Sequence, residues 1–158
     1  MRIAPDPHLR CSSSGFTLIE LIIAIVVISV LTSLALPVFF DSIRKSRRSE
    51  AFTAINAVQQ AQERWRANNA MYASDLTSAA PTGLALSATT PKYYAIALAN
   101  TSATGYDVTA TAVSGTTQAE DKDCALLGLR MAGGNMTYAG AGPSGSLSYS
   151  ATNKCWAR

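Results

Sequence analysis

The sequence predicts an α+β protein in which a long N-terminal helix packs on a small antiparallel β-sheet head. Residues 16–40 are apolar and carry one charge, at Glu20. Residues 41–69 contain neither Gly nor Pro, and strand-like segments follow from Lys92. The 158-residue chain is therefore expected to hold one small domain at the end of a long helix.

The first half of the predicted helix, residues 16–40, has the length and composition of a membrane span. Its 25 residues would extend roughly 37 Å at 1.5 Å per residue, which exceeds a bilayer core of about 30 Å. We expect a transmembrane helix. An acidic residue inside such a run is costly, so Glu20 is a functional candidate.

Residues 1–15 form a polar leader that ends in a small residue directly before the apolar run. Cleavage after Gly15 would keep the hydrophobic helix and create a new amine on Phe16, whereas an ordinary secretory signal is discarded with its apolar stretch. The segment from Gly15 to Glu20, GFTLIE, resembles the class III signal of type IV pilins and pseudopilins. This resemblance implies cleavage by prepilin peptidase and N-methylation of Phe16. It also implies that residues 16–40 form the core of a fibre, in which Glu20 pairs with the amine of a neighbouring subunit during assembly.

One position departs from the usual pattern of the family. Many pilin leaders place Lys or Arg directly before the glycine, where this chain has Ser14. The alternative interpretation of this region is a plain single-pass anchor that contains the motif by chance. The position of the motif at the start of the apolar run favours the pilin interpretation.

Residues 41–69 are predicted to continue the helix as an amphipathic half. Apolar side chains recur there at spacings of three and four and cover one face. They are Ala51, Ala54, Ile55, Ala57, Val58, Ala61 and Trp65. The pair Asn68-Asn69 is a stop signal. This half is therefore expected to support the head.

Four basic residues, Arg44, Lys45, Arg47 and Arg48, lie where the two halves of the helix meet. One interpretation is contact with anionic lipid headgroups before assembly or with acidic groups in the fibre. The other is a solvated stretch of helix. Both interpretations stay open at the level of the sequence.

Residues 70–158 are predicted to form the β-sheet head. Residues 70–91 are rich in Ala, Thr, Ser and Pro and indicate an irregular connection. The expected strands are residues 92–99, 105–113, 124–131 and 136–139, with a short edge at 147–150. Short turns between them favour an antiparallel meander. Tyr93, Tyr94 and Tyr106 are interpreted as packing residues and not as a ligand platform.

Cys124 and Cys155 are the two cysteines of the predicted exported part, because Cys11 falls in the leader. In an oxidising compartment this pair is expected to form a disulfide. The alternatives are two buried thiols or a metal pair, although the sole histidine, His8, also lies in the leader and leaves too few ligands for zinc. The chain is similar to PilE-type minor pilins, in which two cysteines bound the C-terminal region.

No enzymatic constellation is recognisable, and no cofactor or metal is predicted. The acidic run at Glu120, Asp121 and Asp123 lacks the full twelve-residue pattern of a calcium loop and is interpreted as a solvated turn. From Ala70 onward five basic residues face five acidic ones, so the head charge does not support DNA binding. A DNA-uptake receptor would need Lys92, Lys122, Lys154 and Arg158 to form one patch.

The resemblance implies a structural subunit, a minor pilin, that supports pilus assembly and pilus-dependent adhesion, twitching motility or DNA uptake. Its expected partners are other pilin subunits, prepilin peptidase, the inner-membrane assembly machinery and membrane lipid. The expected location is the inner membrane with a periplasmic head, followed by the cell-surface pilus. The alternatives are a major pilin, a DNA-uptake receptor pilin and a type II secretion pseudopilin.

Overall fold

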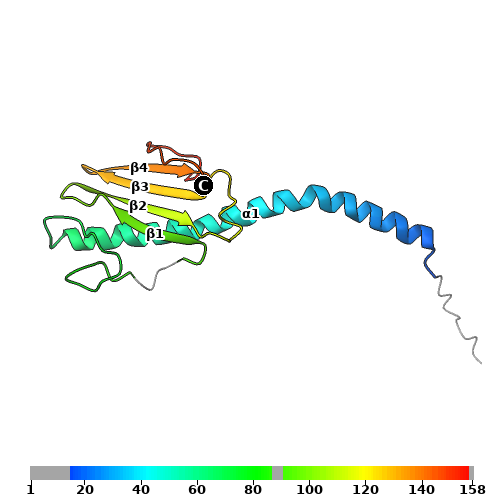
Figure 1. Cartoon of the computed structure of the whole chain (residues 1–158), viewed down its shortest axis with the longest axis horizontal. Helices are drawn as coiled ribbons and strands as arrows, with labels where there is room; N and C mark the ends of the chain where they lie inside the picture. Colours follow the sequence, from blue (N-terminus) through cyan, green and yellow to red (C-terminus); the bar gives the residue numbers. More distant parts are fainter. Residues whose placement is uncertain (1–14, 87–90, 157–158) are drawn as a thin grey trace, which may run out of the picture. The chain divides into compact units, whose positions relative to one another are not determined.

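The computed structural model describes residues 15–86 and 91–156, and the leader residues 1–14 and Arg158 lie outside these ranges. Within the described ranges the chain forms one α-helix and one four-stranded sheet (Figure 1). The elements are α1 (Leu18–Arg66), β1 (Tyr94–Ala99), β2 (Gly105–Ala112), β3 (Leu126–Ala132) and β4 (Asn135–Ala141). The predicted α+β class is therefore confirmed.

The chain divides into two compact units, Met1–Phe39 and Phe40–Arg158. In the first unit the large apolar side chains of α1 are all solvent-exposed, from 44% at Ile22 to 76% at Leu18. Helix α1 contains a window of mean hydropathy 2.8 and is long and apolar enough to cross a membrane. Exposure of so much apolar surface requires a lipid or protein environment.

The second unit contains a β-meander in which each strand pairs antiparallel with the next one. All four strands begin and end within two residues of the bounds expected from the sequence. Gly133 and Gly134 connect β3 to β4 with φ angles of 55° and 83°, which suits the two-residue turns that join hairpin strands. The expected edge at 147–150 is reduced to one bridge, between Tyr138 and Ser150.

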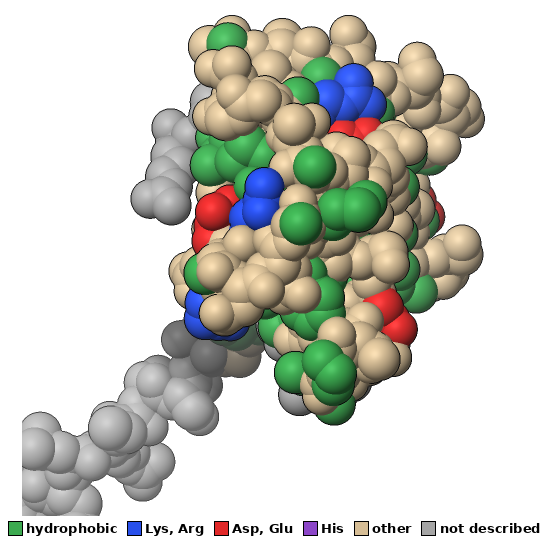
Figure 2. Space-filling view, turned by 90° about the vertical axis from the view of Figure 1, so that its left-hand side faces the viewer, with side chains coloured by type: hydrophobic (Ala, Val, Ile, Leu, Met, Phe, Trp, Pro, Cys, Tyr) green, Lys and Arg blue, Asp and Glu red, His purple; other side chains and the backbone are tan. Residues whose placement is uncertain are grey.

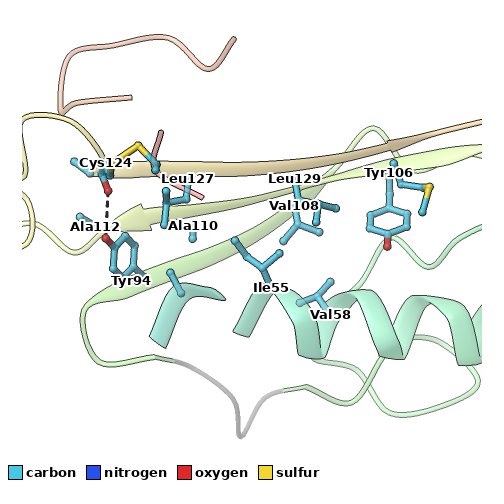
Figure 3. Packing of buried hydrophobic residues seen from close by; sticks show 14 residues of the cluster. Ile55, Val58, Tyr94, Tyr106, Val108, Ala110, Ala112, Cys124, Leu127 and Leu129 are labelled. Atoms are coloured by element: carbon cyan, nitrogen blue, oxygen red, sulfur yellow. Dashed lines mark hydrogen bonds between the residues drawn. A yellow bond between two sulfur atoms is a disulfide. The ribbon is translucent and has the colours of Figure 1, made fainter. Parts of the chain in front are cut away.

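The core lies between the sheet and the second half of α1 (Figure 3). Ile55 and Val58 of the helix are buried against alternate residues of the two central strands, such as Val108 and Leu129. The amphipathic prediction is confirmed for this face of α1. Tyr94 and Tyr106 are fully buried, which confirms their interpretation as packing residues.

Helix α1 ends at Arg66, three residues before the predicted end. The side-chain amide of Asn69 donates a hydrogen bond of 2.9 Å to the carbonyl of Trp65, which also accepts the backbone N–H of Asn68 at 3.1 Å at the helix end. Gln62, which is 0% exposed, then fixes the following loop by donating to Ala73 O at 2.8 Å and accepting from Ala73 N at 2.9 Å.

Candidate functional site

The start of α1 is stabilised by the motif residues themselves. Thr17 precedes the first helical residue, and its hydroxyl accepts the backbone N–H of Glu20 at 3.3 Å. The sequence Thr-Leu-Ile-Glu thus follows the capping-box pattern, in which Ser or Thr is followed three residues later by Glu or Gln. The spacing of Thr17 and Glu20 in the signal is therefore also a helix-start signal.

Glu20 lies in the first helical turn, where the helix dipole favours a negative charge. The residue is exposed, and within the described part of the chain its carboxylate forms no ion pair. Phe16 is also exposed. Both residues are therefore open to a partner outside the chain.

The basic segment of α1 contacts the loop that precedes β3. Arg44 donates to Thr117 O at 3.1 Å and pairs with Glu120 at 3.2 Å. Arg47 donates to the hydroxyl of Thr117. Within the described ranges Lys45 forms no ion pair, and its side chain is exposed.

Arg48 forms the most buried contact of this segment. Its Nε and Nη2 each donate to one oxygen of Asp121 at 2.8 Å. The Asp121 side chain is only 4% exposed and that of Arg48 only 15%. Gln118 adds a hydrogen bond of 3.1 Å to the same carboxylate and one of 2.8 Å to the hydroxyl of Tyr94. This network fastens α1 to the sheet through polar groups.

The interpretation of residues 120–123 as a solvated turn is wrong for Asp121. Its carboxylate accepts the backbone N–H groups of Asp123 at 3.2 Å and Cys124 at 3.1 Å, in addition to Arg48. A buried carboxylate needs such donors because desolvation penalises its charge. Glu120 and Asp123 are exposed, as the turn interpretation requires.

Cys124 and Cys155 form the expected disulfide, with Cα atoms 5.7 Å apart and a sequence separation of 31. The bond joins the segment before β3 to the C-terminal segment. Gly140 of β4 lies directly beneath it, since a Cβ there would collide with the Cys155 sulfur. The disulfide thus holds the C-terminal segment against the edge of the sheet.

We expect Cys124→Ala to lower the free energy of unfolding of the head by about 2 to 5 kcal/mol, because the unfolded chain gains the freedom of the opened loop. Urea unfolding of the full chain, followed by circular dichroism, measures the loss. Wild-type protein in reducing agent is the matched control and should lose a similar amount. Complete labelling of both thiols without reductant would contradict the bond.

The four cations expected to form a patch are placed differently from one another. Lys154 pairs with exposed Asp123, and Arg158 lies outside the described residues. Lys92 instead belongs to a cluster with Arg47, since both cations lie over the ring of Tyr93, at 5.5 Å and 4.0 Å from its centroid. Cation–π contacts of this kind hold positive charge at the surface.

The end of the head that carries the loop between β1 and β2 lies away from residues 44–48. There a basic side chain is paired with an acidic one. Asp107 receives two hydrogen bonds of 2.7 Å from Arg130 and one of 2.7 Å from Asn100. The hydrogen bonds from Arg130 hold the pKa of the Asp107 carboxyl below its usual range. Figure 2 shows that basic side chains on this end are scattered and do not form one patch.

Comparison with known proteins gives a consistent assignment. Residues 10–36 match the prokaryotic N-terminal methylation motif. Together with the exposed apolar helix and the antiparallel head, this match defines the class of type IV pilins. Residues 37–128, more than half of the chain, match the family described as type IV minor pilin ComP, DNA uptake sequence receptor. The chain belongs to this minor pilin family.

Two curated relatives are similar to the chain over part of their length. One is a fimbrial protein of Moraxella nonliquefaciens, 38% identical over 69 residues, which are 44% of this chain and 45% of the relative. The other is fimbrial protein EcpC of Eikenella corrodens, 34% identical over 71 residues, or 45% of this chain and 46% of the relative. The chain thus spans about half the length of these relatives. No solved structure matches it significantly.

These matches bear on the interpretations that the sequence left open. The family description favours a minor pilin over a major pilin or a type II secretion pseudopilin. The pilin family is structural and is not known for enzymes.

Proposed function

We propose that this chain is a minor type IV pilus subunit that is cleaved after Gly15, methylated at Phe16 and held in the inner membrane before assembly, with its head in the periplasm. The exposed apolar half of α1 is the observation that carries this proposal. In a fibre, other helices would cover the same surface, and Glu20 would meet the amine of a neighbouring Phe16. The contacts of Arg44, Arg47 and Arg48 within the head leave Lys45 as the best candidate for lipid headgroups.

We expect the mature protein to begin at methylated Phe16, because the methylation motif and the capped helix start meet there. Intact-mass analysis of sheared filaments tests this. A Gly15→Leu variant is the matched control and should keep residues 1–15 and remain in the membrane fraction. A wild-type mass that includes the leader, or that corresponds to another start, would refute the assignment.

We also propose that the head binds DNA, with the Arg47–Tyr93–Lys92 cluster as a contact to phosphate. The proposal is supported by the description of the family and by the position of basic residues. Near the end of the head that holds residues 44–48, Lys45, Lys92 and Lys122 are exposed, and within the described ranges they form no ion pair. The head carries equal numbers of basic and acidic residues, but its lysines without ion pairs lie near one end. The equal count is therefore a weaker argument against DNA binding than it was from the sequence alone.

We expect Lys92→Ala to weaken binding of duplex DNA to a similar extent for all sequences. The loss of one phosphate contact should reduce the slope of log K against log salt by about one. Fluorescence anisotropy of a labelled duplex over a KCl series measures both quantities. Arg64→Ala removes the same charge from the last turn of α1, away from residues 44–48, and should leave the slope unchanged. Equal slopes for wild type and Lys92→Ala would exclude this cluster from the interface.

A further inference from the structure

A groove of about 440 Å³ lies on the head between α1, β4 and the C-terminal segment. Leu129 forms part of its lining beneath the more exposed residues. The groove is distinct from the Arg47–Tyr93–Lys92 cluster, because the two share no residue. Its lining includes Phe52, Asn56, Tyr138, Thr152, Asn153 and Trp156.

Three aromatic rings give the groove a rigid apolar wall. The ring centroid of Trp156 lies 4.9 Å from that of Phe52 and 4.9 Å from that of Tyr138. The indole N–H donates to Ala139 O at 2.8 Å. The orientation of Trp156 is thus fixed by β4 and α1, so a ligand would meet a preformed surface.

Polar groups with unused hydrogen-bonding capacity line the same groove. Within the described ranges, the Asn56 amide and the Tyr138 hydroxyl have no protein hydrogen-bond partner. Asn153 uses its Oδ1 to accept the N–H of Cys155 at 2.9 Å, which leaves its NH₂ group available. Thr152 adds a hydroxyl. Amides offer both donors and acceptors, so they complement ligands that also carry both.

Among the described residues, no charged side chain lines the groove. A nucleotide or phospholipid headgroup brings a phosphate that would find no cation there. A hydrocarbon would leave the amides and hydroxyls without partners. The lining therefore matches a neutral ligand that has an apolar ring face and several hydroxyl groups. Hexose sugars have this combination, and ligand pockets commonly pair an apolar wall with a few convergent polar groups.

We propose that this groove binds a neutral hexose unit of a saccharide, packed on the aromatic wall and hydrogen-bonded to Asn56 and Asn153. The site would give the pilus subunit an affinity for glycans on a surface. This activity does not depend on the DNA binding proposed above, since it uses other residues. Trp156 reports on occupancy because it lies in the groove, whereas Trp65 does not line it.

The test is a titration of the full mature chain, labelled with ¹⁵N-tryptophan, in micelles of a detergent that has no sugar headgroup. The probes are the methyl glycosides of glucose, galactose, mannose, N-acetylglucosamine and N-acetylgalactosamine. At least one should shift the Trp156 indole signal saturably with a Kd of about 1 to 10 mM, the range of a weak single-unit contact. The Trp65 signal should not move. A Trp65→Phe sample assigns the two signals.

Matched variants separate binding from folding. Asn56 is exposed, so Asn56→Ala should leave the spectrum of the head intact and weaken the bound sugar about three- to tenfold through one lost hydrogen bond. Asn68→Ala removes an exposed amide outside the groove from the loop after α1 and should bind like wild type. Equal affinities of Asn56→Ala and wild type would overturn the proposal.

Two further results would also overturn it. One is the absence of any saturable Trp156 shift with all five glycosides up to about 50 mM, well above the expected dissociation constants. The other is a saturable Trp156 shift with a short DNA duplex that Asn56→Ala weakens. That result would assign the groove to nucleic acid. Weaker DNA binding by Lys92→Ala with sugar binding intact would support two separate sites.

Discussion

Asp121→Ala is expected to destabilise the head by about 3 to 5 kcal/mol, the usual cost of removing one partner of a buried ion pair. The variant leaves the guanidinium of Arg48 without its carboxylate in a site where the arginine side chain is 15% exposed. It also removes the acceptor of the Cys124 N–H. Urea unfolding of the full chain, followed by circular dichroism, measures the change in the free energy of unfolding.

Asp123→Ala is the matched control for this prediction. Asp123 pairs with Lys154, but the two side chains are 60% and 69% exposed, so the loss should be between about 0 and 1 kcal/mol. Arg48→Met should cost less than Asp121→Ala, because Asp121 would keep Gln118 and two backbone donors. Similar losses for Asp121→Ala and Asp123→Ala would show that the network does not hold the helix to the sheet.

The same network predicts a dependence on pH. Burial by itself raises the pKa of the Asp121 carboxyl, but the hydrogen bonds and charge of Arg48 and the N–H groups of Cys124 and Asp123 lower it overall. A lowered pKa in the folded state gives stability that is present above the unfolded value of about 3.9 and is lost as the pH falls below it. The stability difference between wild type and Asp121→Ala should therefore shrink below about pH 4.

The sequence predicted the fold well because its signals are periodic and local. Apolar residues at helical spacing gave the buried face of α1, including Ile55 and Val58. Turn residues together with either alternation, as in β2, or a high content of Tyr and Ile, as in β1, located the strands. The cysteine count indicated the disulfide once the leader was set apart. Each of these signals depends on neighbouring residues or on simple counting, so no knowledge of the tertiary structure was needed.

The polar contacts could not be predicted in the same way, because they join residues far apart in sequence. Arg48 and Asp121 are 73 positions apart, and each belongs to a charged run typical of solvent. Gln62 is similar, since a glutamine on a helix is usually exposed. The total charge of the head also does not show which of its lysines form ion pairs with acidic residues. The groove beside Trp156 depends on three segments meeting, which no local pattern shows.

Glu20→Val is expected to reduce incorporation of the subunit into filaments about tenfold or more, while insertion and cleavage remain largely intact. In the bilayer Glu20 lies near the end of the apolar run and can stay partly hydrated, so the monomer tolerates it. In a fibre the carboxylate would be enclosed by other helices, where only a cation can offset its desolvation. The amine of a neighbouring Phe16 is the cation that our proposal supplies. Comparing sheared filaments with membrane fractions measures the effect.

Glu20→Gln distinguishes the charge of this residue from its role at the helix start. Glutamine is as acceptable as glutamate in a capping box, and the Thr17 hydroxyl accepts the backbone N–H of residue 20 in either case. A charge pair across subunits, however, requires the carboxylate, because a neutral amide leaves the amine of the neighbour buried and unpaired. Glu20→Gln should therefore reduce incorporation into filaments to a similar extent as Glu20→Val. Assembly of Glu20→Gln at the wild-type level would show that the carboxylate serves the helix start alone and that apolar packing sets the register of the fibre.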